Sequence, residues 1–154
     1  EMNSLSKSHN MAGWRVGMML GAADVIRQLL KVKTQMDSGM FRGIQEAAVK
    51  ALQADAAWYE SLNAEYRRRQ AVARRIMDVL GCVYDPAAGG LYVWGKVPAG
   101  TAAELSDRIL YEAGVFITPG FIFGSNGERY VRISLCASVP TLQKALEKIG
   151  VLCK

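Results

Sequence analysis

The residues with the clearest chemical potential lie together near the start of the sequence. Lys7 follows Ser4 and Ser6, and Arg15 comes eight positions later with a glycine two residues to either side. A lysine amine can condense with an aldehyde to form a Schiff base. A guanidinium binds a phosphate through two parallel hydrogen bonds, and serine hydroxyls add further donors. The segment therefore favours a small ligand that carries both an aldehyde and a phosphate group.

Pyridoxal phosphate has both groups, and residues 4–17 (SLSKSHNMAGWRVG) resemble the attachment motif for this cofactor in class I and II aminotransferases. The motif is most similar to the branch that includes aspartate, alanine and LL-diaminopimelate aminotransferases. This resemblance implies that Lys7 is the catalytic Schiff-base lysine and also moves the substrate proton. It implies that Ser4, Ser6 and Arg15 hold the cofactor phosphate. The alternative is a surface lysine and a helix-end arginine near a serine-rich turn.

A second candidate site lies on a predicted strand, Tyr130 to Leu135. Its residues alternate between Val131, Ile133 and Leu135 on one face and Tyr130, Arg132 and Ser134 on the other. A buried charge without a partner costs several kcal/mol, so Arg132 requires an anionic partner. The resembling family carries an arginine in such a Tyr-Val-Arg-Ile-Ser segment to bind the substrate α-carboxylate, which implies this role for Arg132. The alternative is a structural ion pair with one of the 14 acidic residues.

Several residues near these two sites allow more than one interpretation of their role. His9, the only histidine, follows Lys7 by two positions; we expect a turn residue, because the family does not fix a histidine there. Residues 119–124 (PGFIFG) resemble a loop near the family's substrate entrance, and ordinary packing explains their aromatic side chains equally well. Met40 and Phe41 lie where relatives approach a neighbouring subunit's active site. We expect Cys136 to be a core residue and not a nucleophile.

The hydrophobic pattern predicts helices first and a mixed region afterwards. Apolar residues at helical spacing predict helices over 21–33, 42–54 and 58–80, with Gly81 as a cap for the last. A further helix is expected to begin at Thr101, which has the capping-box spacing to Glu104, and the last one at Ser138. Short strands are predicted at 1–6, 14–20, 82–85, 91–94, 115–117 and 130–135.

This order of elements predicts an α/β fold whose last part is a small α+β domain. It resembles the C-terminal domain of fold-type I pyridoxal-phosphate enzymes, preceded by the last elements of their large domain. The resemblance implies that residues 1–40 end the cofactor-binding domain, that residues 41–80 are helices including a long interdomain helix, and that residues 81–154 form the small domain. Because the lysine motif lies past the middle of the family's polypeptide, we expect a C-terminal portion with weak or no activity alone.

The composition is that of an ordinary globular protein. The 154 residues are 51% hydrophobic and 21% charged, which does not indicate disorder. The net charge of +5 and the arginines of the long predicted helix fit an anionic partner, yet no nucleic-acid motif accompanies them, so we expect no nucleic-acid partner. The apolar run at residues 16–23 is too short for a membrane span. Three widely spaced cysteines fit neither a disulfide framework nor a zinc site, so we expect a cytoplasmic location and no metal.

The resemblance implies an aminotransferase that moves an amino group between an amino acid and a 2-oxo acid, with pyridoxal 5'-phosphate as cofactor and a homodimer as the assembly. Two alternatives stay open. A pyridoxal-phosphate-dependent lyase that performs β-elimination would share Lys7, Arg15 and Arg132. A transcription regulator would use the same fold to sense pyridoxal phosphate beside a DNA-binding module.

Overall fold

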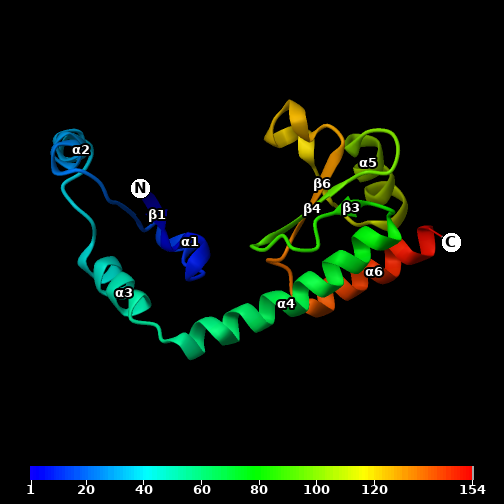
Figure 1. Ribbon diagram of the computed structural model, residues 1–154, viewed down its shortest axis with the longest axis horizontal. Helices are drawn as coiled ribbons and strands as arrows, with labels where there is room; N and C mark the ends of the chain where they lie inside the picture. Colours follow the sequence, from blue (N-terminus) through cyan, green and yellow to red (C-terminus); the bar gives the residue numbers. More distant parts are fainter. Residues whose placement is uncertain (154) are drawn as a thin grey trace. The chain divides into compact units, whose positions relative to one another are not determined.

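The computed structural model describes residues 1–153. The chain divides into two compact units, the first Glu1–Tyr59 and the second beginning at Glu60. Figure 1 colours the chain along its sequence, so that the first unit runs from blue through cyan and the second from green to red. Helix α4 (Ala56–Val79) has residues in both units. The three-part division expected from the sequence, with boundaries after residues 40 and 80, stays a prediction.

The first unit pairs two short strands beside a small buried cluster. Its elements are β1 (Met2–Ser4), α1 (Leu5–Ser8), a 3-10 turn (Ala12–Trp14), β2 (Gly17–Met19), α2 (Ala23–Met36) and α3 (Arg42–Leu52). Strand β1 pairs antiparallel with β2, and Ser4 lies opposite Gly17. Leu5, Met11 and Val16 are buried, and one side of α3 packs against them.

Both strands of this unit are shorter than predicted. The pairing of residues 1–6 stops at Ser4, because Ser4 caps the one-turn helix α1. The pairing of residues 14–20 starts only at Gly17, because residues 12–14 form the 3-10 turn and Arg15 follows in the left-handed conformation with φ of 54°. The helices predicted over 21–33 and 42–54 are confirmed as α2 and α3.

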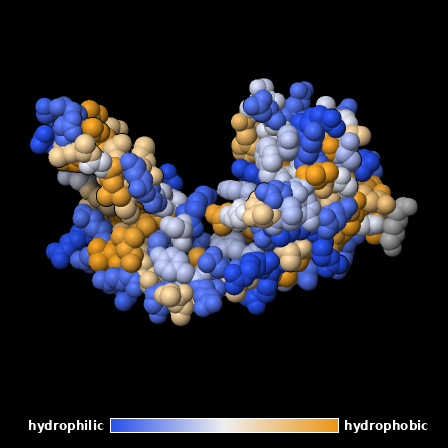
Figure 2. Space-filling model, in the orientation of Figure 1, coloured by the Kyte–Doolittle hydropathy of each residue, from blue (hydrophilic) through white to orange (hydrophobic). Residues whose placement is uncertain are grey.

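Helix α2 carries apolar side chains that no described residue covers. None of its residues is buried within residues 1–153, and Val25, Leu30 and Met36 are among the exposed ones. Figure 2 shows apolar surface, in orange, over this unit. An apolar face of this kind marks a contact surface in most proteins. No helix of the described chain is both long and apolar enough to cross a bilayer.

The second unit is built on a four-stranded sheet. After α4 it contains β3 (Val83–Tyr84), β4 (Tyr92–Lys96), α5 (Ala102–Ala113), β5 (Thr118–Pro119), β6 (Tyr130–Ser134) and α6 (Val139–Leu152). The strand order is β3-β4-β6-β5, and all neighbours are antiparallel. Within β6, Arg132 lies opposite Trp94 of β4 on one side and Thr118 of β5 on the other.

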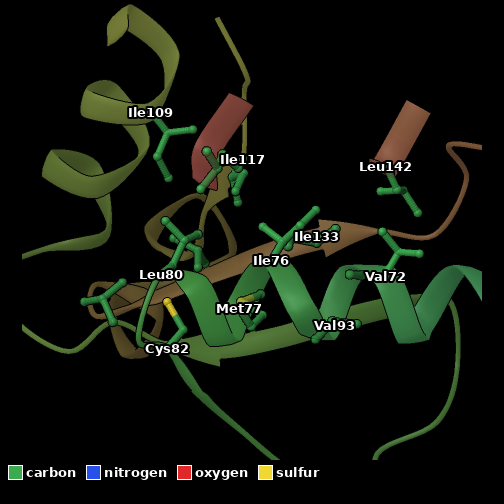
Figure 3. Close-up of a cluster of buried hydrophobic side chains, with 14 of the residues drawn as sticks. Val72, Ile76, Met77, Leu80, Cys82, Val93, Ile109, Ile117, Ile133 and Leu142 are labelled. Atoms are coloured by element: carbon green, nitrogen blue, oxygen red, sulfur yellow. The ribbon is translucent and has the colours of Figure 1, made fainter. Parts of the chain in front are cut away.

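Apolar side chains from α4, α5 and α6 pack against one face of this sheet. Val93 and Ile133 point to this face, since they lie opposite each other in the β4–β6 register and both are buried. Figure 3 shows them together with Ile76 of α4. Successive side chains of a strand alternate between faces. Trp94 and Arg132 therefore project from the face that the helices leave uncovered.

The predicted helix-boundary signals at Thr101, Ser138 and Gly81 are confirmed, whereas Gly150, which was expected to end the last helix, lies within α6. Thr101 and Glu104 form a reciprocal capping box at the start of α5, where the Glu104 carboxylate accepts the Thr101 N–H at 2.8 Å. This hydrogen bond lowers the pKa of the Glu104 carboxyl. Ser138 caps α6. Gly81 follows α4 with φ of 67°, a conformation that glycine adopts without steric cost.

The strand predicted at residues 115–117 is wrong. Val115 lies just after the C-cap of α5, where its N–H donates to the carbonyl of Ile109 and closes the helix end. The Ile117 carbonyl accepts the buried hydroxyl of Ser106 from α5. Pairing with β6 begins only at Thr118. The apolar run therefore connects α5 to the sheet and is not itself a strand.

Arginines of α4 bind main-chain carbonyls of the second unit. Arg69 donates to the Leu135 carbonyl at 3.0 Å, and Arg74 donates to the Pro86 carbonyl at 2.7 Å. Glu65 accepts hydrogen bonds from Arg69 and Arg68, which lower the pKa of its carboxyl. Arg69 and Arg74 of this basic helix therefore form hydrogen bonds within the second unit.

We expect Ile109→Ala to destabilise the second unit by about 2–5 kcal/mol, because Ile109 is 0% exposed and the change leaves a cavity. Leu110→Ala, a control on the next residue of the same helix, removes a side chain that is 37% exposed. It should cost roughly 0.5 kcal/mol. Hydrogen exchange of the β4 and β6 amides at increasing denaturant measures both changes. Equal effects of the two substitutions would contradict the position assigned to Ile109.

Candidate functional site

The β1–β2 pair brings the serines of the lysine motif close to its arginine. Beyond the pair, the Leu5 N–H donates to the Val16 carbonyl at 3.2 Å. Ser4 Oγ lies 3.2 Å from the same carbonyl oxygen. Gly17 permits this close approach, since a Cβ there would lie 3.0 Å from the carbonyl oxygen of Asn3. The chain therefore doubles back tightly between the serines and Arg15.

Ser4 and Ser6 present two hydroxyls side by side. Ser4 Oγ accepts the Ser6 N–H at 3.1 Å and so caps helix α1. The two Oγ atoms are 2.8 Å apart. Ser8 Oγ donates to the Ser4 carbonyl at 3.2 Å, which further fixes this turn. The two hydroxyls are thus held at one end of the segment that carries Lys7.

Arg15 lines one pocket together with Ser4 and Ser6. The pocket has a volume of about 470 Å³, and its other walls come from β1, β2 and α2. Arg15 Nη1 donates to the Ala12 carbonyl at 3.2 Å, and its other N–H groups have no partner among residues 1–153. A residue other than glycine rarely adopts the left-handed conformation of Arg15, and such residues cluster at functional sites. Two hydroxyls and a guanidinium around one pocket fit the phosphate of pyridoxal phosphate.

Lys7 lies in the last turn of α1 and is exposed. Its amine has no hydrogen bond or ion pair with any described residue. Lys7 follows Ser6 directly, but it is not part of the pocket wall that Ser4, Ser6 and Arg15 share. The amine is therefore accessible to solvent, one residue along the chain from the pocket residue Ser6.

His9 ends helix α1, so it occupies a turn as predicted. Its Nδ1 lies 2.8 Å from Ser8 Oγ and its Nε2 lies 2.8 Å from the Tyr59 hydroxyl. Its ring stacks on Trp58 with centroids 5.5 Å apart and planes at 16°. The sequence did not predict these contacts, because Trp58 and Tyr59 lie about fifty positions later. Their effect is to hold the end of the helix that carries Lys7.

Arg132 has aromatic neighbours and, among the described residues, no acidic partner. Its Cζ lies 4.1 Å from the ring centroid of Tyr92 and 3.9 Å from that of Phe123. Its Nε is buried and has no hydrogen-bond partner within the described chain. The ion pairs found in residues 1–153 all lie on helices or at their ends and leave Arg132 out. A structural ion pair, which the sequence left as the alternative, is therefore absent from the described residues.

The surroundings of Arg132 are aromatic on the open face of the sheet. Trp94, opposite Arg132, stacks on Tyr130 with centroids 5.4 Å apart and contacts the edge of Phe123 at 5.9 Å. Arg132 and Ser134 also border a pocket of about 360 Å³ whose other walls come mostly from the helix-covered side, including Ile76, Ile133 and Leu142, and not from these aromatic rings. The Nε end of this cation is shielded from water, whereas its terminal nitrogens remain open to an anion.

The expectation that Cys136 is a core residue is wrong. Cys136 is exposed and lines the same pocket as Arg132. It follows Leu135, the last buried residue after β6, and its N–H donates to Ser134 Oγ at 3.3 Å. Cys82 is the buried thiol, and burial raises its pKa to about 11.

Comparison with known proteins gives the family. Residues 1–149 match the family model for aminotransferase class I and II. The chain belongs to this family. The sequence-based assignment of the family and of a mixed helix-and-sheet fold is therefore confirmed.

The relatives of this chain in the aminotransferase family are longer than the chain itself. The LL-diaminopimelate aminotransferase of Oleidesulfovibrio alaskensis is 41% identical over 153 residues, which are 99% of this chain and 39% of that protein. Among solved structures, apo-BacF from Bacillus subtilis is 36% identical with a TM-score of 0.88, over 100% of this chain and 40% of its own. The aromatic aminotransferase of Pyrococcus horikoshii is 30% identical with a TM-score of 0.88, over 98% and 41%. The chain thus spans about two fifths of the length of these relatives.

We expect alkylation at pH 8 to separate the cysteines of the native protein. Iodoacetamide should modify Cys136 and Cys153, which are exposed, and spare Cys82, whose buried thiol stays protonated. Mass spectrometry of the peptides measures this. Modification of Cys82 at the rate of Cys136 would contradict its burial.

The buried thiol of Cys82 predicts how the stability of the protein changes with pH. The pKa of Cys82 rises from 9.0 to about 11 on folding, so between these values the unfolded thiol ionises and the folded one does not. The free energy of unfolding should therefore decrease as pH rises through this window. Cys82→Ala should remove this part of the decrease in denaturation curves, and Cys136→Ala is the matched control.

Proposed function

We propose that the protein is a pyridoxal-phosphate-dependent aminotransferase that transfers an amino group between an amino acid and a 2-oxo acid. Membership of the aminotransferase class I and II family supports this proposal. The observation that carries it is the pocket shared by Ser4, Ser6 and Arg15 on the segment that also carries the exposed Lys7. By family resemblance we also infer a homodimer and a cytoplasmic location.

Three side chains are suited to the cofactor phosphate. The Arg15 guanidinium supplies two parallel N–H donors, and the hydroxyls of Ser4 and Ser6 supply two more. When bound, pyridoxal 5'-phosphate supplies an aldehyde for attachment to an amine and a ring that withdraws electrons from the reacting carbon. Lys7 Nζ is the attachment point in this proposal. Once displaced by substrate, the same Nζ takes the proton from the substrate α-carbon and later returns a proton.

Arg132 is suited to the part that amino acids and 2-oxo acids share. Both have an α-carboxylate, which a guanidinium binds through two N–H groups at once. Because Arg132 lies within a paired strand, its position is fixed before a ligand arrives. One orientation for both substrates raises the rate by placing the α-carbon correctly for Lys7 in each half of the reaction.

Acceptor dependence tests the reaction class. The whole protein, supplied with pyridoxal phosphate, should convert amino acids only when a 2-oxo acid such as 2-oxoglutarate is present. The names of the relatives make LL-diaminopimelate and aromatic amino acids the first donors to test. Release of pyruvate and ammonia without an acceptor would instead identify the β-eliminating lyase.

We expect Lys7→Ala to abolish both the visible absorbance of the lysine-bound cofactor and turnover, because the change removes the attaching amine. Lys31→Ala, an exposed lysine on α2, is the control and should change neither. An unchanged spectrum of Lys7→Ala would refute the assignment of Lys7.

Arg15→Lys keeps the charge but loses one charge-assisted hydrogen bond, worth about 1.5–3 kcal/mol. The dissociation constant of the cofactor should then rise roughly 10- to 100-fold.

We expect Arg132→Leu to lower kcat/KM for amino acids roughly 100-fold or more, since the substrate carboxylate loses its buried charge partner. Cofactor retention, measured by absorbance after dialysis, should stay unchanged. Arg129→Leu is the control, because Arg129 binds carbonyls of residues 97 and 98 and does not contact the aromatic side chains around Arg132. A loss of cofactor equal to the loss of activity would argue against a substrate role for Arg132.

A further inference from the structure

Phe123 lies on a loop whose position relative to the sheet is fixed. Residues 120–127 form two consecutive 3-10 turns between β5 and β6. Gly120 and Gly127 are buried, and their backbones touch: a Cβ on Gly120 would lie 2.5 Å from the Gly127 carbonyl oxygen. That Cβ would also lie 2.6 Å from the carbonyl oxygen of Tyr130 in β6. The two glycines therefore anchor the Phe123 loop on the strand that carries Arg132.

The ring of Phe123 covers one side of the Arg132 guanidinium. Its centroid is 3.9 Å from Arg132 Cζ, a distance typical of a close cation–π contact. Tyr92 covers a second side at 4.1 Å. The Nε end is buried without a partner, whereas the terminal nitrogens are not among the buried atoms. Two aromatic rings and a buried Nε thus leave the terminal nitrogens as the accessible part of the guanidinium.

We propose that Phe123 is a positioning residue that acts through Arg132. By holding the guanidinium plane against Tyr92, it turns the terminal N–H groups toward the carboxylate of an incoming substrate and sharpens selection of an anionic carboxylate over a neutral carboxamide or ester. This inference rests on the proposed role of Arg132 as the carboxylate-binding residue. A guanidinium held in one orientation loses less conformational freedom on binding than a free one does.

Phe121 lies on the same turn as Phe123 but does not make the contact with Arg132. Both phenylalanines lie on the same turn, and both are 49% exposed. Phe123 contacts Arg132 and the edge of Trp94, whereas no ring or cation contact of Phe121 is found in the described chain. The two side chains are matched in type, exposure and location. Phe121 is therefore a control for everything except the contact with Arg132.

The test compares Phe123→Leu with Phe121→Leu in the whole protein. The probes are acetate and acetamide, which have nearly the same shape and differ in charge; binding is followed by the NMR shift of the Trp94 indole N–H. Phe123→Leu should raise the dissociation constant of acetate roughly 3- to 30-fold, the range of one desolvated cation–π contact. The affinity for acetamide should stay unchanged. Phe121→Leu should alter neither, and Phe123→Tyr should restore acetate binding.

Kinetics of the amino acid that the acceptor assay selects give a second readout. Phe123→Leu should raise KM by the same 3- to 30-fold and change kcat much less, because the contact acts before the chemical step. In an Arg132→Leu background, Phe123→Leu should add nothing, since the residue through which it acts is gone.

The outcomes distinguish the positioning role of Phe123 from the proposed carboxylate-binding role of Arg132. Equal weakening of acetate and acetamide, or additive effects of Phe123→Leu and Arg132→Leu, would overturn the positioning role of Phe123. So would acetate binding that depends on Arg132 but not on Phe123, while the carboxylate role of Arg132 would then stand. Acetate binding unchanged by Arg132→Leu would instead remove the proposed role of Arg132 itself.

Discussion

The open face of the sheet in the second unit is organised around Arg132, a guanidinium without an acidic partner among the described residues. Arg132 has a buried Nε and no ion pair within the described chain. Cation–π contacts with Tyr92 and Phe123 are worth about 0.5–2 kcal/mol each. An unpaired charge that is fully buried costs several kcal/mol; here only the Nε end is buried, and the contacts offset part of the smaller cost. The remainder has to be met by water or an anion at the terminal nitrogens, which explains why this end of the side chain stays open.

The register of the sheet determines where this charge lies. Arg132 is opposite Trp94, and its neighbour Ile133 is opposite Val93 in the core. A slip of one residue would bring Arg132 into the core and Ile133 onto the open face, because side chains alternate. The buried side chains of α4, α5 and α6 oppose such a slip. The hydrophobic core therefore fixes the charged site although no core residue touches the charge from the open face.

The sequence predicted what depends on local patterns and missed what depends on distant contacts. Helical spacing, the capping box at Thr101 and the alternation around Arg132 were sufficient for the helices and for β6. The role of Phe123 was not predictable, because Phe121 has the same type, loop and exposure and only the tertiary fold separates them. Cys136 was predicted wrongly as a core residue, because it lies in the turn after β6 and not in the strand itself.

The two arginines proposed to bind anions are held in different ways, and the difference suits what each would bind. Arg15 lies on a tight turn beside two hydroxyls, which together offer many donors to a phosphate dianion. A cofactor stays bound through many turnovers, so additional donors are an advantage there. Arg132 offers only its terminal nitrogens, because aromatic rings take the other sides. A substrate has to leave after each half-reaction, and a site with fewer donors and a rigid frame binds selectively without holding its ligand too long.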